Sequence, residues 1–409
     1  MTPRVDLASG APETTPPGTD PLPSRPPLTV LHSLSAPNGT TRYIDQVVGG
    51  APAELTVRFF SWRGALLGRY DLLHLHWPEF VVRDPSAAKA LLRRGALRVV
   101  LVRCRMLRVP VIRTVHNLRP HEAGRPAEDR ILASVDRCTA VFIRLNPTTP
   151  IPSGAVSSGA VSNRTVSNGT VLTIAHGHYR DRFAELHCPA TLPGRLLYFG
   201  LIRPYKGVED LLAVFHHITD PDLQLRIVGR PSYGLGPVVE AALLEDDRMS
   251  ACLRFVSDAE LVTEVGLAEL VVLPYREMHN SGSVLVALSL NRPVLVPDSA
   301  ANQALAAEVG EGWVYTYSGE LNPAILEAAV HKLRSDPRSA QPELSGRDWS
   351  TIGEATYRAY LAARAALRRQ RLPGPLERVP SPSAPPSPSP SVSPSVLSSS
   401  PDVVNNAPR

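Results

Sequence analysis

Short apolar runs alternate with longer stretches of mixed polarity along most of the chain. The runs before residue 150 are LTVLHSL, ELTVRFF, DLLHLHW, PVIRTVH and TAVFIRL, and those after residue 170 are VLTIAH, LLYFGLI, LQLRIVG, CLRFVS, LVVLPY, PVLVP and WVYTY. Continuous apolar strands separated by helical stretches are typical of parallel sheets covered by helices on both faces. The pattern therefore predicts an α/β fold with two doubly wound, Rossmann-like domains, at residues 28–147 and 171–348.

Four segments depart from this alternation. Residues 1–27 and 372–409 are rich in Pro, Ser and Thr and hold few large apolar side chains, so we expect disordered tails. Residues 148–170 contain the degenerate repeat SGAVS SGAVS NRTVS NGTV, which indicates a Ser/Gly/Val loop or linker between the domains. Residues 349–371 have a helical pattern with no strand after them.

The composition is that of a two-domain enzyme. The 409 residues are 43% hydrophobic and 20% charged, enough for two cores. The net charge of +5 is spread along the chain without a nucleic-acid-binding motif, which argues against a nucleic-acid partner. The four cysteines form no CxxC pair, which argues against zinc and disulfides. With no apolar leader and no long uncharged apolar run, we expect a cytoplasmic protein.

One basic stretch suggests peripheral contact with a membrane. The segment ALLRRGALRVVLVRCRML is apolar, and many cations lie within it or directly beside it: Lys89, Arg93, Arg94, Arg98, Arg103, Arg105 and Arg108. A surface helix of this kind could dock on an anionic leaflet beside a lipid-linked acceptor. The alternative is a sheet-covering helix with a solvated basic face.

The strand–helix junctions of the second domain suit phosphate binding, because ligands of doubly wound sheets lie at the carboxyl ends of strands. In GLIRPYKG, Arg203 and Lys206 lie in one short loop, which suits a diphosphate, although a solvated helix start is the alternative. In NSGSVLVALSL, small residues precede a helix whose N–H groups would face an anion, although a plain N-cap would look the same. The candidate donor-binding residues are Gly200, Arg203, Lys206, Gly229, Arg230, Val256, Asn280, Ser281, Gly282 and Ser283.

A metal site is not expected. Asp220-Pro221-Asp222 has D-x-D spacing, but it precedes a strand and holds a turn proline, so a surface turn accounts for it.

The order of these motifs resembles the donor half of GT-B glycosyltransferases, in particular the bacterial group that uses GDP-mannose and UDP-sugars. DLLHLHWPE and VPVIRTVHNLRPHE resemble the acceptor half, and the helix from Trp349 resembles the closing helix that crosses back to the first domain. The resemblance covers residues 28 to 370. It implies transfer of a hexose, with mannose favoured, from a nucleotide diphosphate sugar to a saccharide or lipid-linked acceptor. It also implies no cofactor and no metal, the diphosphate being neutralised by Arg203, Lys206 and a helix start.

Two other functions fit the same ligand. One is a sugar-nucleotide epimerase of the same fold, and the other is a non-catalytic protein that binds a nucleotide sugar. The second is suggested by a departure from the family pattern. Its retaining members carry two glutamates eight positions apart near NSG, and those positions fall at Met278 and Val286. Glu277 could replace the first glutamate, and nothing replaces the second. The absence of these two glutamates favours an inverting reaction with a base in the first domain.

The first domain offers that base. VIRTVHNLRPHE places His116, His121 and Glu122 in a loop that would face the cleft, and the resemblance implies that His116 reaches the donor sugar. The catalytic candidates are therefore His116, Glu122 and Glu277. A buried, hydrogen-bonded histidine is the alternative for His116.

The acceptor candidates come from two strand ends of the same domain. They are Asn38 and Gly39, in a loop that resembles the acceptor-facing loop of the family, and His76, Trp77 and Glu79 in HLHWPE. Alternation places His74 and His76 on one face of their strand. Trp77 could stack on a sugar or fill the core.

Overall fold

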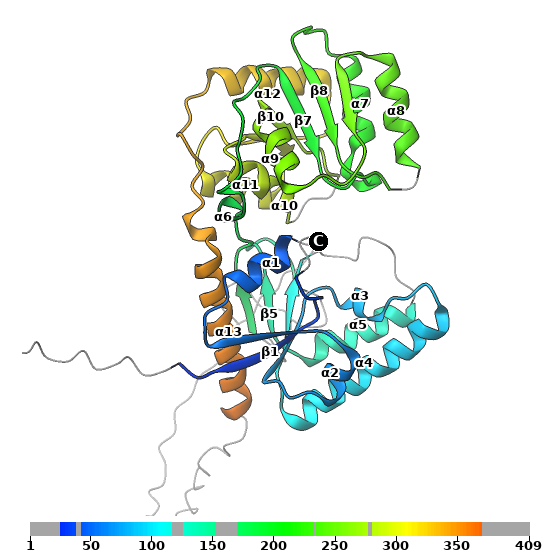
Figure 1. Cartoon of the computed structure of the whole chain (residues 1–409), viewed down its shortest axis with the longest axis vertical. Helices are drawn as coiled ribbons and strands as arrows, with labels where there is room; N and C mark the ends of the chain where they lie inside the picture. The colour runs from blue at the N-terminus through cyan, green and yellow to red at the C-terminus, as the bar shows by residue number, and fades with distance from the viewer. Residues whose placement is uncertain are drawn as a thin grey trace, which may run out of the picture. The chain divides into compact units, whose positions relative to one another are not determined.

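The computed structural model describes residues 25–37, 42–116, 126–151, 170–232, 234–276 and 280–369. These residues form two six-stranded parallel sheets with helices packed on them (Figure 1). The predicted two-domain α/β architecture is therefore confirmed. The tails up to residue 24 and from residue 370, the repeat from 152 to 169, and the candidates Asn38, Gly39, Glu122 and Glu277 lie outside the described residues.

The first sheet has the strand order β2-β1-β3-β4-β5-β6. Its strands are β1 (Leu28–His32), β2 (Leu55–Phe59), β3 (Leu72–Leu75), β4 (Val111–Val115), β5 (Thr139–Arg144) and β6 (Thr170–Thr173). The chain runs outward from β1 to β2 and then returns to β3, so the strand order reverses between β1 and β3. This reversal point is where ligands of doubly wound sheets bind.

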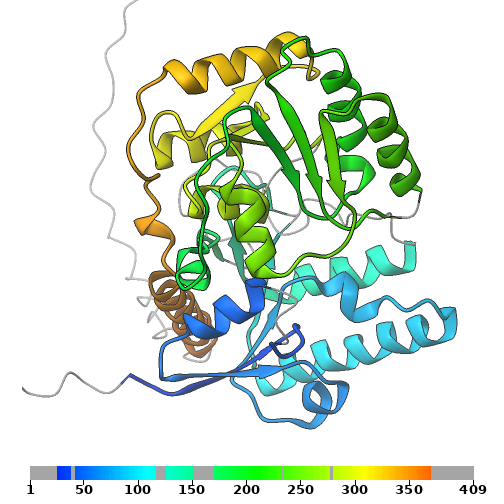
Figure 2. The ribbon, with the colours of Figure 1, turned by 45° about the horizontal axis from the view of Figure 1, so that its top comes forward.

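Helices cover both faces of the first sheet. They are α1 (Arg42–Gly49), α2 (Trp62–Leu67), α3 (Pro78–Val82), α4 (Ala87–Leu107), α5 (Pro126–Cys138) and, from the end of the chain, α13 (Trp349–Arg369). Alternate strand residues face opposite ways: Val30 and Leu72 pack with α13, whereas Leu31 and Leu73 pack with α4 and α5. Figures 1 and 2 both show α13 lying along the first sheet.

The second sheet has the order β12-β11-β10-β7-β8-β9. Its strands are β7 (Arg195–Phe199), β8 (Gln224–Val228), β9 (Met249–Cys252), β10 (Leu270–Val272), β11 (Val294–Pro297) and β12 (Val314–Tyr317). Its helices are α7 (Val208–His216), α8 (Leu235–Glu245), α9 (Asp258–Gly266), α10 (Gly282–Ser289), α11 (Ala300–Val309) and α12 (Pro323–Ser335). This is the dinucleotide-binding strand order, with its reversal between β7 and β10. A short helix, α6 (Arg180–Phe183), precedes β7, and two 3-10 helices cover Pro204–Lys206 and Ser345–Arg347.

Three predicted boundaries need correction. VLTIAH was assigned to the second domain, but β6 pairs with β5 of the first sheet; its apolar pattern does not reveal which sheet it joins. CLRFVS was predicted as a strand, but β9 ends at Cys252, the first residue of this run, because this edge strand is only partly buried and needs no apolar run. Arg25 was assigned to the tail, yet it forms an ion pair with Glu354 of α13 at 2.5 Å.

The part of the chain that the structure describes contains no helix long and apolar enough to cross a membrane.

Candidate active site

Glycines bring the loops of the second domain close together at the β7–β10 reversal point. Gly229 has φ +152°, and a Cβ there would lie 1.7 Å from the carbonyl oxygen of Gly200. Gly200 has φ +121°, and its Cβ would meet Ser283 Oγ at 3.3 Å and Lys206 Nζ at 3.4 Å. Only glycine fits this backbone conformation and this close approach. The loops after β7 and β8 and the start of α10 therefore meet at one place.

Lys206 is held at this junction by the Tyr275 hydroxyl, which is itself hydrogen-bonded to Ser283. Its Nζ donates to Tyr275 Oη at 3.1 Å, and Tyr275 Oη donates to Ser283 Oγ at 3.2 Å. Lys206 Nζ also lies 4.5 Å from the centre of the Tyr275 ring. The cation comes from the loop after β7, the phenol from the loop after β10, and the serine from the first turn of α10. An ammonium beside a helix N-terminus is suited to bind an anionic group.

A cavity of about 350 Å³ opens beside this lysine. Its lining includes seven of the predicted donor residues: Gly200, Lys206, Gly229, Arg230, Val256, Gly282 and Ser283. Val286, one of the two positions where the family resemblance implied a glutamate in retaining members, also lines it. Arg203 precedes the 3-10 helix and is not among the lining residues.

Two of the predicted donor residues have other partners. Ser281 is the N-cap of α10, its Oγ accepting from the N–H of Val284 at 3.3 Å, as the N-cap alternative predicted. Asn280 donates through Nδ2 to the carbonyl oxygen of His116 at 2.9 Å and accepts from Asn146 at 2.7 Å. Both ends of the Asn280 amide are therefore engaged, and the residue ties the α10 loop to the His116 backbone.

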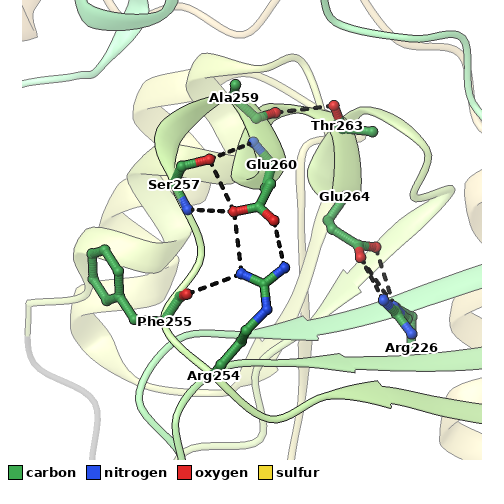
Figure 3. Close-up of polar contacts among 8 residues, drawn as sticks. All are labelled: Arg226, Arg254, Phe255, Ser257, Ala259, Glu260, Thr263 and Glu264. Atoms are coloured by element: carbon green, nitrogen blue, oxygen red, sulfur yellow. Dashed lines mark hydrogen bonds and ion pairs between the residues drawn. The ribbon is translucent and has the colours of Figure 1, made fainter.

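The loop after β9 forms another wall of the cavity and is rigidly built (Figure 3). Ser257 and Glu260 form a capping box at the start of α9. Arg254 donates to Glu260 at 2.5 Å, and this hydrogen bond lowers the pKa of the Glu260 carboxyl to about 2. Phe255 and Val256 lie between these anchored residues and line the cavity. An aromatic ring beside backbone groups is a surface on which a nucleobase can stack.

In the first domain, histidines gather at the strand ends next to the β1–β3 reversal point. His32 ends β1 and pairs in register with His74 of β3. His76 follows β3, and His116 follows β4. All four side chains are buried. Parallel register thus places four imidazoles from three strand ends at one edge of the sheet.

These side chains form an unbranched series of hydrogen bonds, which we call the histidine chain. It consists of His116, His76, His32, Tyr360, His74 and Thr114, in that order. The distances are 3.1 Å from His116 Nε2 to His76 Nδ1, 3.0 Å from His76 Nε2 to His32 Nδ1, 3.2 Å from His32 Nε2 to Tyr360 Oη, 2.6 Å from Tyr360 Oη to His74 Nδ1, and 2.8 Å from His74 Nε2 to Thr114 Oγ1.

Burial keeps these imidazoles neutral. Desolvation lowers the pKa of His32 to about 4 and holds the pKa values of His74, His76 and His116 well below the usual 6.5. Neighbouring histidines lower the pKa values of His74 and His76 further. Neutral imidazoles can accept a proton, act as general bases or bind a metal ion.

His32, His74 and His76 lie close enough together to hold a metal ion, since their candidate ligand atoms are within 4.8 Å of one another. However, both ring nitrogens of each of the three histidines already take part in the hydrogen bonds of the histidine chain. Binding of a metal ion would break several of these bonds.

The other first-domain candidates surround His116 or lie away from it. Trp77 stacks on His116 with ring centroids 3.9 Å apart, and Tyr43 meets the same ring edge-on. His76 is only 3% exposed and is a buried hydrogen-bond partner of His116, and its contact with an acceptor stays a prediction. Glu79 is buried on α3, where desolvation raises its pKa and the charges acting on it are those of Arg113, Arg83 and Glu128.

Sequence reasoning missed His32, Tyr275 and Tyr360 as site residues, and it placed His74 beside His76 without assigning it a role. The alternation of HLH indicated that His74 and His76 share a face, and LVVLPY placed Tyr275 after a strand; these were the available signals. Tyr360 lies 286 residues from His74, and only the packing of α13 on the first sheet brings the two together.

The fold and this site place the chain among the GT-B glycosyltransferases. Residues 193–336 match the family model described as "Glycosyl transferases group 1". Over 340 residues the chain is 47% identical to the GDP-mannose:glycolipid 4-beta-D-mannosyltransferase of Xanthomonas campestris pv. campestris, covering 83% of this chain and 93% of that protein. The chain belongs to the group 1 glycosyltransferases and is a hexosyltransferase, so the predicted family and enzyme class are confirmed.

More distant relatives show the same fold. The chain is 27% identical to a Mycobacterium tuberculosis glycogen synthase over 329 residues, which are 77% of this chain and 72% of that protein. The solved structure of Anabaena HepE with UDP and glucose superimposes with a TM-score of 0.51 at 13% identity, covering 84% of this chain and 99% of that one. The solved structure of sucrose-phosphate synthase from Thermosynechococcus elongatus superimposes with a TM-score of 0.50 at 14% identity, covering 85% of this chain and 99% of that one.

Proposed function

We propose that this enzyme transfers a mannosyl group from GDP-mannose to a glycolipid acceptor with inversion at the anomeric carbon. The observation that carries the proposal is the donor cavity, which Lys206 and six other predicted residues line at a strand reversal point. The choice of mannose and of a glycolipid rests on the 47% identical relative, whose name specifies both.

The stereochemistry follows from two supports. The relative is named a 4-beta-mannosyltransferase, and a β-linked product from the α-linked donor requires inversion. In this chain, Val286 lines the donor cavity where retaining members of the family have an acidic side chain. Inversion in a single displacement needs a general base for the acceptor hydroxyl on the side opposite the leaving group.

The proposed reaction assigns a role to each domain. His116, held neutral by burial, takes the proton of the acceptor hydroxyl as its oxygen attacks the anomeric carbon. The bond from that carbon to the diphosphate breaks, and GDP leaves with the developing negative charge. Lys206 and the N–H groups of Gly282 and Ser283 stabilise this charge. Glu122 and Glu277 remain alternative catalytic carboxylates, and Arg203 a further cation for the diphosphate.

The acceptor side of the proposal places the enzyme at a membrane surface. One face of α4 is buried through Leu97, Val100, Leu101 and Cys104. Another face exposes large apolar side chains, namely Leu91, Leu92, Val99, Val102 and Met106, which are between 57% and 77% exposed. At 100° per residue, Arg94, Arg98 and Arg105 project along one border of this apolar face. We propose that this face inserts shallowly into an anionic leaflet that contains the glycolipid.

A donor panel tests the proposed function. The full-length enzyme is incubated with a glycolipid fraction and one radiolabelled donor per reaction, either GDP-mannose, UDP-glucose or GDP-glucose. Labelled lipid is then extracted. We expect labelled lipid with GDP-mannose and none with the other two donors. Transfer from UDP-glucose in preference to GDP-mannose would overturn the donor assignment, and label released as free mannose only would overturn the glycolipid acceptor.

A further inference from the structure

We propose that the histidine chain couples the tautomers of its imidazoles to His116 and shares the proton that His116 removes from the acceptor hydroxyl. The inference deepens the proposed function and rests on His116 being the base. It assigns a positioning role to His76, His32, His74 and Tyr360, none of which needs to touch a substrate.

The hydrogen-bond pattern permits only two ordered arrangements of protons. Each of the five links holds one proton, and each histidine other than His116 uses both ring nitrogens within the chain. Either every imidazole carries its proton on Nε2 or every one carries it on Nδ1. A mixed arrangement would either place two protons, or none, in a link between two histidines, or leave the proton of the buried Tyr360 hydroxyl without an acceptor in the chain. The tautomer of His116 is therefore set by groups as distant as Tyr360.

The first arrangement prepares His116 for catalysis. With all protons on Nε2, His116 donates to His76 and leaves its Nδ1 lone pair free. Nδ1 has no hydrogen-bond partner among the described residues. Stacking on Trp77 at 3.9 Å and the link to His76 at 3.1 Å fix the plane of the ring. A base with a fixed tautomer and orientation meets the geometric requirement for general-base catalysis.

The proton balance is simple. The acceptor O–H bond breaks and an N–H bond forms at His116 Nδ1, so His116 becomes an imidazolium. Its Nε2 proton can then move to His76 Nδ1, and the Nε2 proton of His76 to His32 Nδ1. The chain as a whole carries one extra proton until it returns through His116 to water after the product leaves. Sharing this charge over several rings lowers the cost of placing it in a buried site.

The groups around the histidine chain come from several elements. Tyr43 of α1 faces the rings of His76 and His116, and Tyr360 of α13 joins His32 to His74. A positive charge on His116 is disfavoured by Arg113 of β4 and, once it is itself protonated, by His176, which follows β6. These two groups make an unshared imidazolium at His116 more costly, which increases the effect expected from sharing.

Helix α13 supplies a matched pair of variants for the test. Tyr360→Phe removes the hydroxyl that links His32 to His74 and keeps the aromatic ring. Tyr357→Phe, three residues earlier, removes a buried hydroxyl that donates to the carbonyl oxygen of Pro26 at 2.6 Å and does not contact the histidine chain. Tyr360→Phe removes two hydrogen bonds and Tyr357→Phe removes one, so a larger loss of stability is expected in Tyr360→Phe. Only Tyr360→Phe should affect the tautomers.

The experiment combines nitrogen-15 NMR of histidine in the free full-length enzyme with kinetics. In the wild type we expect the chain histidines to share one tautomer. In Tyr360→Phe we expect a mixture of histidine tautomers. We also expect a kcat lowered roughly tenfold, an unchanged KM for GDP-mannose and a steeper loss of kcat below neutral pH. Tyr357→Phe should match the wild type in all four. His76→Phe should lower kcat further, by about a hundredfold.

The proposal is overturned if the wild-type histidines show mixed tautomers, if Tyr360→Phe and Tyr357→Phe behave alike, or if the purified enzyme holds a stoichiometric metal ion by elemental analysis. The NMR result needs no turnover. It therefore tests the histidine chain independently of the proposed function. Failure of the proposed function would appear as an active His116→Ala enzyme or as transfer from another donor.

Discussion

At the residue scale, Lys206 is the cation best placed to hold the leaving diphosphate. Its ammonium lines the donor cavity, whereas Arg203, the other cation of the same loop, does not. Lys206→Ala should remove a charge-assisted hydrogen bond of roughly 1.5 to 3 kcal/mol, so that the affinity for GDP falls about ten- to a hundredfold. Arg203→Ala should cost less. Titration calorimetry with GDP measures both, and a larger loss in Arg203→Ala would contradict the placement of Lys206.

The buried histidines make stability depend on pH in a defined direction. The unfolded chain takes up protons below about pH 6.5, but folded His32 does so only near pH 4, so the free energy of unfolding should decrease as the pH falls through this window. For His32 alone the loss at pH 5 is about 2 kcal/mol. Urea unfolding between pH 7 and 5 measures it. His32→Asn should show a flatter pH dependence, and an equally steep one would contradict the assignment.

At the scale of elements, the apolar face of α4 predicts binding to anionic vesicles. The double variant Leu92→Glu with Met106→Glu places charges on this face without touching the buried face of the helix. We expect at least a tenfold loss of binding to vesicles of phosphatidylglycerol and phosphatidylcholine in co-sedimentation. Leu244→Glu, at a 90% exposed position of α8, is the control and should bind normally. Equal binding by all three proteins would exclude α4 as the docking surface.

The elements were largely predictable because their signals are local. Apolar runs coincide with nearly all strands, and the motif GLIRPYKG located Lys206 from its neighbours alone. The failures concern information that is not local. The run at β6 does not encode its pairing with β5. In CLRFVS only Cys252 belongs to a strand, and Phe255 and Val256 line the cavity. The histidine chain depends on register between β1 and β3 and on a tyrosine from the far end of the chain.

At the scale of the whole molecule, α13 completes the first domain although it follows the second in sequence. Tyr357 and Tyr360 pack with Val30, Leu72 and Ile112 in one core cluster. A chain ending at residue 348 should therefore lose the fold of the first domain, since this cluster would be opened to water. A chain ending at residue 369 keeps every described contact and is the control.

Limited proteolysis with mass spectrometry checks this prediction. In the shorter chain, cleavage should concentrate before residue 170, while the second domain resists. Equal resistance of the first domain in both chains would show that α13 is not part of its core.

The central claim is that a base in the first domain drives an inverting mannosyl transfer, with Lys206 and α10 holding the departing GDP in the second. The most direct measurement is the anomeric configuration of the product, read from the one-bond carbon–hydrogen coupling of the transferred mannose in NMR. The account predicts a β-linked mannose from α-linked GDP-mannose, formed by the wild type and lost in His116→Ala. An α-linked product, or an undiminished rate of β-transfer in His116→Ala, would contradict it.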